Sequence, residues 1–190
     1  MNQQVGQLYH ASPVQRLTQI VPHIGTHGQN WVYATDDIVV AAMFLGRLGG
    51  DFTCASGICG GKPYLCERFA GAFEQRYGKA SGSLYVLSDV GFLAGQTSYR
   101  KDFVNSKAVT PLEERRVDNA QAYLLALMSE AKLVIKYYPE RYCISDDDGD
   151  LVEKAARMVT RFGQSVLEQV MEFHPKLLGR VEEELAKNKT

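Results

Sequence analysis

The residues best suited to chemistry stand at the ends of two short apolar segments near the start of the chain. His10 follows the apolar pair 8–9, and about twenty residues later Tyr33 and Thr35 end the segment 31–35. An imidazole, a phenol ring and a hydroxyl together offer hydrogen-bonding groups and a flat apolar face. If the two segments lie side by side, this set of side chains suits a nucleotide or sugar ligand.

Several strands and helices must position these residues. Four segments have the β-branched or aromatic residues and the flanking turn residues that are typical of strands: 7–10, 31–34, 83–88 and 108–116. Ser12–Pro13 predicts the start of a short helix over 14–20. A second helix is expected from Thr35 or Asp36 to Leu48, with its apolar face packed under the sheet.

The sequence after residue 48 predicts an insertion and then a helical extension. Residues 49–82 contain a Gly-rich loop and a helical piece over 64–77, and this insertion could form a lid or a rim of the binding site. Three helices are expected further on, over 120–137, 150–173 and 175–187. We therefore predict an α+β core over residues 1–118 and a helical extension over 119–190 that packs on the core.

Charge and hydropathy argue against general affinity for nucleic acid or membranes. The chain has 21 basic and 22 acidic side chains, a net charge of -1, so no global field would attract polyanions. Its apolar runs are shorter than the roughly 20 residues that cross a bilayer, and the N-terminus lacks the features of a signal peptide. We therefore expect a cytoplasmic protein with no membrane partner and no evident nucleic-acid partner.

Two clusters invite a metal-binding interpretation, and neither fits one well. Cys54, Cys59 and Cys66 lie in a Gly-rich stretch, but they lack the C-x-x-C spacing that structural zinc usually requires. With no export signal, we expect reduced thiols. The acidic run 146–150 has Arg157 where a calcium loop needs glutamate, so a solvated helix-capping turn is expected there.

Other histidines and motifs add little. His23 and His27 lie in the loop between the first two strands, where we expect solvated positions. No Walker loop, nucleophile elbow or dinucleotide-binding G-x-G-x-x-G occurs, so the sequence gives no support to P-loop, α/β-hydrolase or Rossmann functions.

The order and spacing of three motifs resemble the ADP-ribosyltransferase-like superfamily, which includes the small rifampicin-modifying transferases and the poly-ADP-ribose-polymerase-like enzymes. The motifs are Leu8-Tyr9-His10-Ala11-Ser12, Trp31-Val32-Tyr33-Ala34-Thr35 with a helix behind it, and Gly82-Ser83-Leu84-Tyr85-Val86-Leu87. The later segment 102–111 is similar to one that follows the third strand in rifampicin-type enzymes. The resemblance covers about residues 7–118 and implies a small, split, mostly antiparallel sheet.

The resemblance also implies that NAD binds as a substrate in a bent conformation. His10 would hydrogen-bond the ribose hydroxyls of the adenosine half, and the backbone at Ala11 would receive the nicotinamide carboxamide. Tyr33 would stack on the nicotinamide ring, and Thr35 would help to hold the sugar. Ser12 completes this set of expected cofactor-binding residues.

The implied chemistry is loss of nicotinamide through an oxocarbenium-like state at the ribose, which a nearby negative charge stabilises. Relatives often have an acid after the third strand, but the stretch 91–96 has no carboxylate. Gln96 is the nearest polar side chain, and Asp102 or Glu113 could reach in if the loop folds back. Gln96 and Asp102 are therefore the candidate catalytic residues.

Three functions stay open on this evidence. The first is an NAD-binding mono-ADP-ribosyltransferase-like enzyme with an unknown acceptor. The second is a catalytically silent nucleotide-binding module of the same fold, whose insertion or C-terminal helices engage a protein partner. The third is an RNA-phosphate-processing relative, which is disfavoured because that group uses several arginines that this N-terminal half does not evidently provide.

Overall fold

The chain forms two compact units in the computed structural model, which describes residues 6–25, 28–46, 49–97, 99 and 101–187. Unit 1 comprises 1–47 and 77–133, and unit 2 comprises 48–76 and 134–190. The fold is α+β with mostly antiparallel sheets, as predicted. The boundaries differ from those expected, because most of the insertion 49–82 groups with the C-terminal segment instead of forming part of the core. Its role as a lid stays a prediction.

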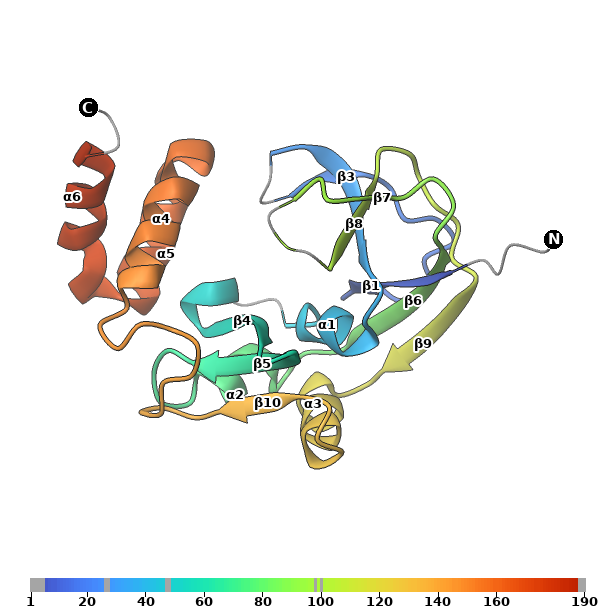
Figure 1. The fold of residues 1–190 in the computed structure, drawn as a ribbon, viewed down its shortest axis with the longest axis horizontal. Coiled ribbons are helices and arrows are strands. Elements are labelled where there is room, and N and C mark those ends of the chain that lie inside the picture. The colour runs from blue at the N-terminus through green and yellow to red at the C-terminus, as the bar shows by residue number, and fades with distance from the viewer. Residues whose placement is uncertain (1–5, 26–27, 47–48, 98, 100, 188–190) are drawn as a thin grey trace. The chain divides into compact units, whose positions relative to one another are not determined.

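The sheet of unit 1 has the strand order β7-β8-β3-β1-β6-β9, and β2 pairs with β3 (Figure 1). Every pair in it is antiparallel. The strands are β1 (Gln7–Ser12), β2 (His23–Ile24), β3 (Asn30–Thr35), β6 (Gly82–Ser88), β7 (Leu93–Ala94), β8 (Asp102–Asn105) and β9 (Glu113–Val117). Three of the four predicted strands thus correspond to β1, β3 and β6. These three, which contain the sequence motifs, are direct neighbours.

A helix covers this sheet as predicted, but it is shorter than expected. Helix α1 (Ile38–Met43) contacts β1, β3 and β6 with an almost wholly buried set of residues. Its N-cap is Asp37, whose Oδ1 accepts a hydrogen bond of 2.9 Å from the N–H of Val39. Thr35 therefore ends β3 and does not cap the helix. The second helix of unit 1, α3 (Ala120–Ser129), also ends earlier than predicted, shortly before Ala131, which has a φ of 56°.

The predicted helix over 14–20 is absent. The hydroxyl of Tyr85 donates to the Val14 carbonyl at 2.9 Å and accepts from the Leu17 N–H at 3.0 Å. The Glu114 carboxylate accepts from the Arg16 N–H at 2.8 Å. These contacts with β6 and β9 hold the segment in a non-helical conformation, and Arg16 has a left-handed φ of 59°. The fourth predicted strand, 108–116, begins only at Glu113, as β9.

Unit 2 combines a small sheet with helices. Its strand order is β10-β5-β4, and β10 runs parallel to β5. The predicted helical piece over 64–77 divides into β5 and α2, and the predicted helix over 150–173 is interrupted at Gly163. The elements are η1 (Gly50–Phe52), β4 (Cys54–Cys59), β5 (Lys62–Glu67), α2 (Ala72–Tyr77, whose last residue belongs to unit 1), β10 (Val134–Lys136), α4 (Gly149–Phe162), α5 (Gln164–Phe173), η2 (Pro175–Leu177) and α6 (Leu178–Lys187).

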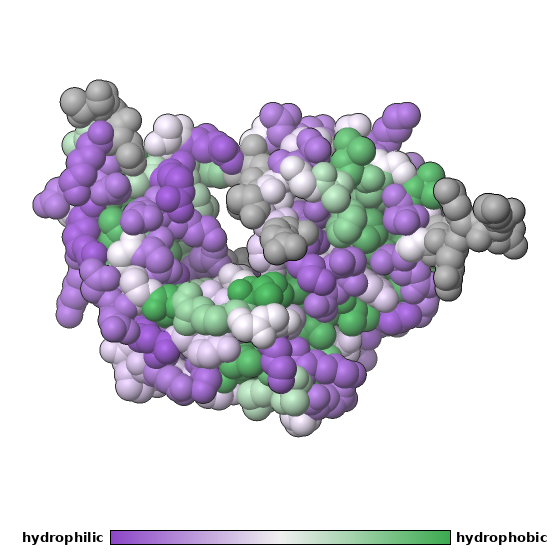
Figure 2. All heavy atoms as spheres, in the orientation of Figure 1, coloured by the Kyte–Doolittle hydropathy of each residue, from purple (hydrophilic) through white to green (hydrophobic). Residues whose placement is uncertain are grey.

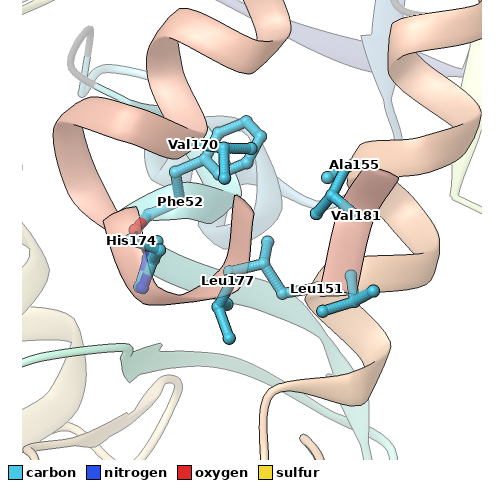
Figure 3. A pocket seen from close by; sticks show the side chains of 8 residues that line it. Phe52, Leu151, Ala155, Val170, His174, Leu177 and Val181 are labelled. Carbon is cyan, nitrogen blue, oxygen red and sulfur yellow. Dashed lines mark hydrogen bonds between the residues drawn. The ribbon is translucent and has the colours of Figure 1, made fainter. Parts of the chain in front are cut away.

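The helices of unit 2 pack around a hydrophobic core. Phe52 lies among buried residues of α4, α5 and α6, and the hollow beside it has no room for a water molecule (Figure 3). His174 hydrogen-bonds the Phe52 carbonyl through Nε2 at 2.6 Å. On the face drawn in Figure 2 these helices present mostly hydrophilic residues, as amphipathic helices do. No helix that the described ranges contain combines the length and the apolar character that a bilayer span requires.

One prediction about the cysteines is wrong. Cys59 and Cys143 form a disulfide, with 6.5 Å between their Cα atoms, whereas Cys54 and Cys66 are free and buried. This disulfide joins the β4–β5 hairpin to the segment before α4. The expectation of four reduced thiols overlooked that this segment returns beside the hairpin.

The acidic run 146–150 extends into the first turn of α4, and arginines neutralise much of it. The capping-turn prediction is confirmed only in part: the N-cap Asp148 makes no side-chain capping hydrogen bond, but Asp147 accepts one of 3.0 Å from the Gly149 N–H. The buried Arg68 binds Asp150 with two parallel hydrogen bonds of 3.0 and 2.6 Å, and it also binds Asp148 at 3.2 Å. Arg180 binds Asp147 at 2.8 Å. Paired guanidinium and carboxylate groups of this kind hold an element in place.

Candidate functional site: the split between β1 and β3

The centre of the unit 1 sheet is split between two neighbouring strands. β1 pairs with β6 along all six of its residues, but with β3 only where Tyr9 faces Thr35. Beyond that pair β3 and β8 turn away from β1 and β6 (Figure 1). The edge of β1 at His10, Ala11 and Ser12 therefore has no ladder partner in β3 within the described residues. Backbone groups that leave a ladder need other partners.

His10 bridges the split with its side chain. Its Nδ1 lies 2.7 Å from the backbone oxygen of Tyr33. Because a carbonyl oxygen only accepts hydrogen bonds, Nδ1 is the protonated nitrogen of the neutral ring. Burial lowers the pKa of His10 below 6.5, and the bond to Tyr33 opposes this only in part. The ring is thus neutral near pH 7, and its Nε2 is an acceptor to which no described residue donates.

Aromatic rings gather around Tyr33. The ring centroid of His23 lies 6.0 Å from that of Tyr33 at an interplanar angle of 57°, and that of Trp31 lies 6.1 Å away at 67°. The charge of His23 also lowers the pKa of His10. Both histidines lie near Tyr33, His10 through its hydrogen bond and His23 through its ring contact. Neither neighbouring ring is parallel to Tyr33. His23 is exposed, as expected, but it begins β2 opposite Trp31 and does not lie in a loop. His27 lies outside the described residues.

A carboxylate enters the same sheet beside Thr35. Asp102 is the first residue of β8 and faces Thr35, which in turn faces Tyr9 on β1. Residues directly opposite one another in antiparallel strands point to the same face, so these three side chains share one. Two strand spacings, roughly 10 Å, separate Asp102 from β1. The Asp102 Oδ2 accepts a hydrogen bond of 2.8 Å from the Thr97 hydroxyl.

The remaining predicted site residues have mainly local contacts. The Thr35 hydroxyl accepts from the Asp37 N–H at 3.3 Å, and the Ser12 hydroxyl accepts from the Val14 N–H at 3.1 Å. Ala11 faces Leu84 on β6. Gln96 is exposed in the loop after β7 and donates to the carbonyl of Ala94 at 3.4 Å.

The other candidate acid lies elsewhere in the sheet. Glu113 is exposed on the edge strand β9, where it forms an ion pair of 2.8 Å with Arg115. β9 is separated from β3 by both β6 and β1. Asp102 is therefore the better placed of the candidate acids.

A groove of about 450 Å³ lies at the other end of β8. It is lined by the turn at Val90 and Gly91 and by residues 105–110. None of the predicted site residues lines it. Its polar lining residues are Asn105, Ser106, Lys107 and Thr110, and none of its lining residues is a carboxylate.

Unit 2 offers structural contacts but no evident reaction centre among its described residues. Burial raises the pKa of the Cys54 thiol to about 12 and also raises that of Cys66, so neither is a reactive thiolate near neutral pH. Across the described part of the chain, no three His, Cys, Asp or Glu side chains gather in a way that could hold a metal ion. The zinc interpretation of the cysteines has no geometric support.

Comparison with known proteins adds no family. No protein-family model matches the chain, and no curated protein or solved structure shows significant similarity to it.

Proposed function

We propose that unit 1 binds NAD at the split between β1 and β3 and is an ADP-ribosyltransferase-like domain that transfers ADP-ribose to an acceptor still to be identified. The proposal rests on one observation above all, the hydrogen bond by which His10 joins β1 to Tyr33 where the strands part. Burial keeps the imidazole neutral even though this bond favours the charged ring, and the bond leaves Nε2 as the acceptor for a ligand hydroxyl.

The sheet agrees with the resemblance that the motifs suggest. The three motif segments are adjacent central strands of a small antiparallel sheet that opens between two of them. This is the kind of split sheet that an ADP-ribosyltransferase-like fold implies. The place of β6 beside β1 was not expected from the sequence, so the order β3-β1-β6 adds support to the proposal.

The resemblance to ADP-ribosyltransferase-like enzymes assigns each residue its proposed role. His10 Nε2 accepts from a ribose hydroxyl, and the ring of Tyr33 offers a flat surface to the nicotinamide. Asp102 supplies the negative charge that favours positive charge developing at the ribose carbon as its bond to nicotinamide breaks. The bonding electrons leave with nicotinamide, and the acceptor then forms the new bond to that carbon.

Replacing His10 by asparagine tests the binding site without removing the bridge. The introduced amide can still donate to the Tyr33 carbonyl from the position of Nδ1, but it lacks an acceptor at the position of Nε2. We expect His10→Asn to weaken NAD binding about tenfold, which corresponds to one lost hydrogen bond. Trp31, the only tryptophan, lies beside Tyr33, so its fluorescence reports the titration.

The control is Thr18→Ala, an exposed position of the same unit, which should bind NAD like the wild type. Thermal melts of all three proteins show whether each is folded. If millimolar NAD changes neither the fluorescence nor the melting temperature of the wild type, the proposed function is wrong.

A silent nucleotide-binding module is the second candidate. It is favoured by the exposed Gln96 and by the hydrogen bond that already engages Asp102 with Thr97. Release of free nicotinamide from bound NAD, followed over hours, separates the two candidates. An enzyme releases it, whereas a silent module shows the binding signal without release.

A further inference from the structure

We propose that Gly25 and His23 are positioning residues that fix the ring of Tyr33 for stacking on a planar base. This inference rests on the proposed function, because it concerns the same site. It gives a role to the segment after residue 22, which the sequence motifs do not include.

Gly25 packs directly against the phenol end of Tyr33. A Cβ atom added at Gly25 would lie 2.6 Å from Cε2 of Tyr33 and 2.8 Å from both Cζ and the hydroxyl oxygen. Such distances are too short for carbon, so the ring would have to move. Gly25 is not among the positive-φ glycines of the chain, so its backbone would accept alanine. A side chain at position 25 would therefore displace the end of the Tyr33 ring.

His23 contacts the ring from a second direction. It begins β2, two residues before Gly25, and its ring is tilted by 57° against that of Tyr33. The pairing of β2 with β3, and the 2.9 Å hydrogen bond from the Gly28 N–H to the Gly25 carbonyl, keep this segment against β3. Trp31 contacts the same ring at an interplanar angle of 67°.

The contact explains how a residue that does not touch the ligand could set affinity. A shift of the ring by about an ångström disturbs stacking and changes its place relative to His10. The strands β1 and β6 do not take part in this contact. Gly25→Ala should therefore reduce NAD affinity strongly and leave the pairing of β1 with β6 intact.

A double-mutant cycle tests the contact itself. We measure thermal unfolding of the wild type, Gly25→Ala, Tyr33→Ala and the double variant. Gly25→Ala should lower the melting temperature of the wild type, and it should have no further effect once the Tyr33 ring is gone. An equal loss in both backgrounds would overturn the proposed contact. This result does not depend on NAD.

NAD titration then tests the positioning role. Gly25→Ala should weaken binding at least about tenfold, because a displaced ring loses its stacking geometry, and His23→Ala by a smaller factor. His23→Phe keeps a ring beside Tyr33 and should restore most of the affinity. Wild-type affinity in Gly25→Ala, or no rescue by phenylalanine, would overturn the positioning role. If Gly25→Ala fails to fold, the two His23 variants decide the question.

The outcomes also separate this inference from the proposed function. Failure of the wild type to bind NAD overturns the function, and the positioning role falls with it, whatever the unfolding cycle shows. Binding that depends on His10 but not on Gly25 or His23 overturns only the inference.

Discussion

At the scale of single residues, the proposed chemistry depends on Asp102. It is the candidate acid that faces Thr35 across a strand pair, whereas Glu113 lies at an edge of the sheet and Gln96 is exposed. A carboxylate at that position can stabilise positive charge at the ribose, but an amide cannot. Binding and turnover should therefore respond differently to the loss of this charge.

Asp102→Asn separates the two effects. The introduced amide oxygen can still accept the hydrogen bond from Thr97, so the local structure and the affinity for NAD should stay within about threefold of the wild type. Nicotinamide release should fall at least about 100-fold, as is typical when one charge-stabilising group is lost. Glu113→Gln, at an exposed edge of the sheet, serves as the control and should release nicotinamide normally. Equal turnover in Asp102→Asn would remove Asp102 from the mechanism.

The candidate site shows where residue-level prediction reaches its limit. The types and spacing of His10, Tyr33 and Thr35 led to the correct pair of neighbouring strands. They could not reveal that His10 binds the Tyr33 backbone, because that bond depends on where β1 and β3 part. Nor could they reveal His23, whose strand is only two residues long and is held by its pairing with β3.

At the scale of elements, predictable segments are those whose own pattern decides their structure. β6 is apolar along most of its length because it is buried between β1 and β9, and its prediction is almost correct. β8 is a strand of four residues within a polar stretch, and it forms because it pairs with β3. No local sequence pattern therefore predicted this strand. The same reason explains the missing helix over 14–20, where side chains of distant strands bind the backbone.

Two glycine substitutions test how far contacts between elements decide stability. We expect them to change the free energy of unfolding in opposite directions. A Cβ at Gly82 in β6 would lie 2.3 Å from the backbone oxygen of Ser12, which cannot move aside without disturbing β1. We expect Gly82→Ala to cost about 1–3 kcal/mol. Gly179 in α6 has open space around it, so Gly179→Ala should stabilise that helix by about 0.5–1 kcal/mol.

Denaturant melts monitored by circular dichroism give both free energies of unfolding. The two variants carry the same chemical change, so a general effect of alanine would shift both midpoints in one direction. If Gly82→Ala is as stable as the wild type, the close approach of β6 to the end of β1 is not a structural requirement.

At the scale of the whole molecule, the chain crosses between its two units, and each unit contains a partly buried histidine. Unit 1 has His10 and unit 2 has His174, and each ring binds a backbone oxygen through one nitrogen. The disulfide between Cys59 and Cys143 closes a loop that includes the second segment of unit 1. Such a link reduces the freedom of the unfolded chain as a whole, so the stabilities of the two units are coupled through the covalent structure.

Acid should destabilise both units through these two histidines. Burial lowers both pKa values below the ordinary 6.5, so in the range just below pH 6.5 the unfolded chain binds more protons than the folded one. The contribution of the two neutral rings to the free energy of unfolding is fully present above about pH 6.5. It decreases as the pH falls toward the pKa values of the folded state. Asp150, with a pKa of about 2, keeps its charge well below this range.

We therefore expect the free energy of unfolding to fall between about pH 7.5 and pH 5.5, by at most about 1.4 kcal/mol per pH unit for each histidine. His10→Asn and His174→Gln should each remove part of this dependence, since each amide can donate from the position of the bonded nitrogen without titrating. The double variant should unfold with nearly the same midpoint at both pH values. A double variant that retains the full acid sensitivity would show that other groups cause it, and the neutral state of His10 on which the proposed NAD binding depends would lose its thermodynamic support.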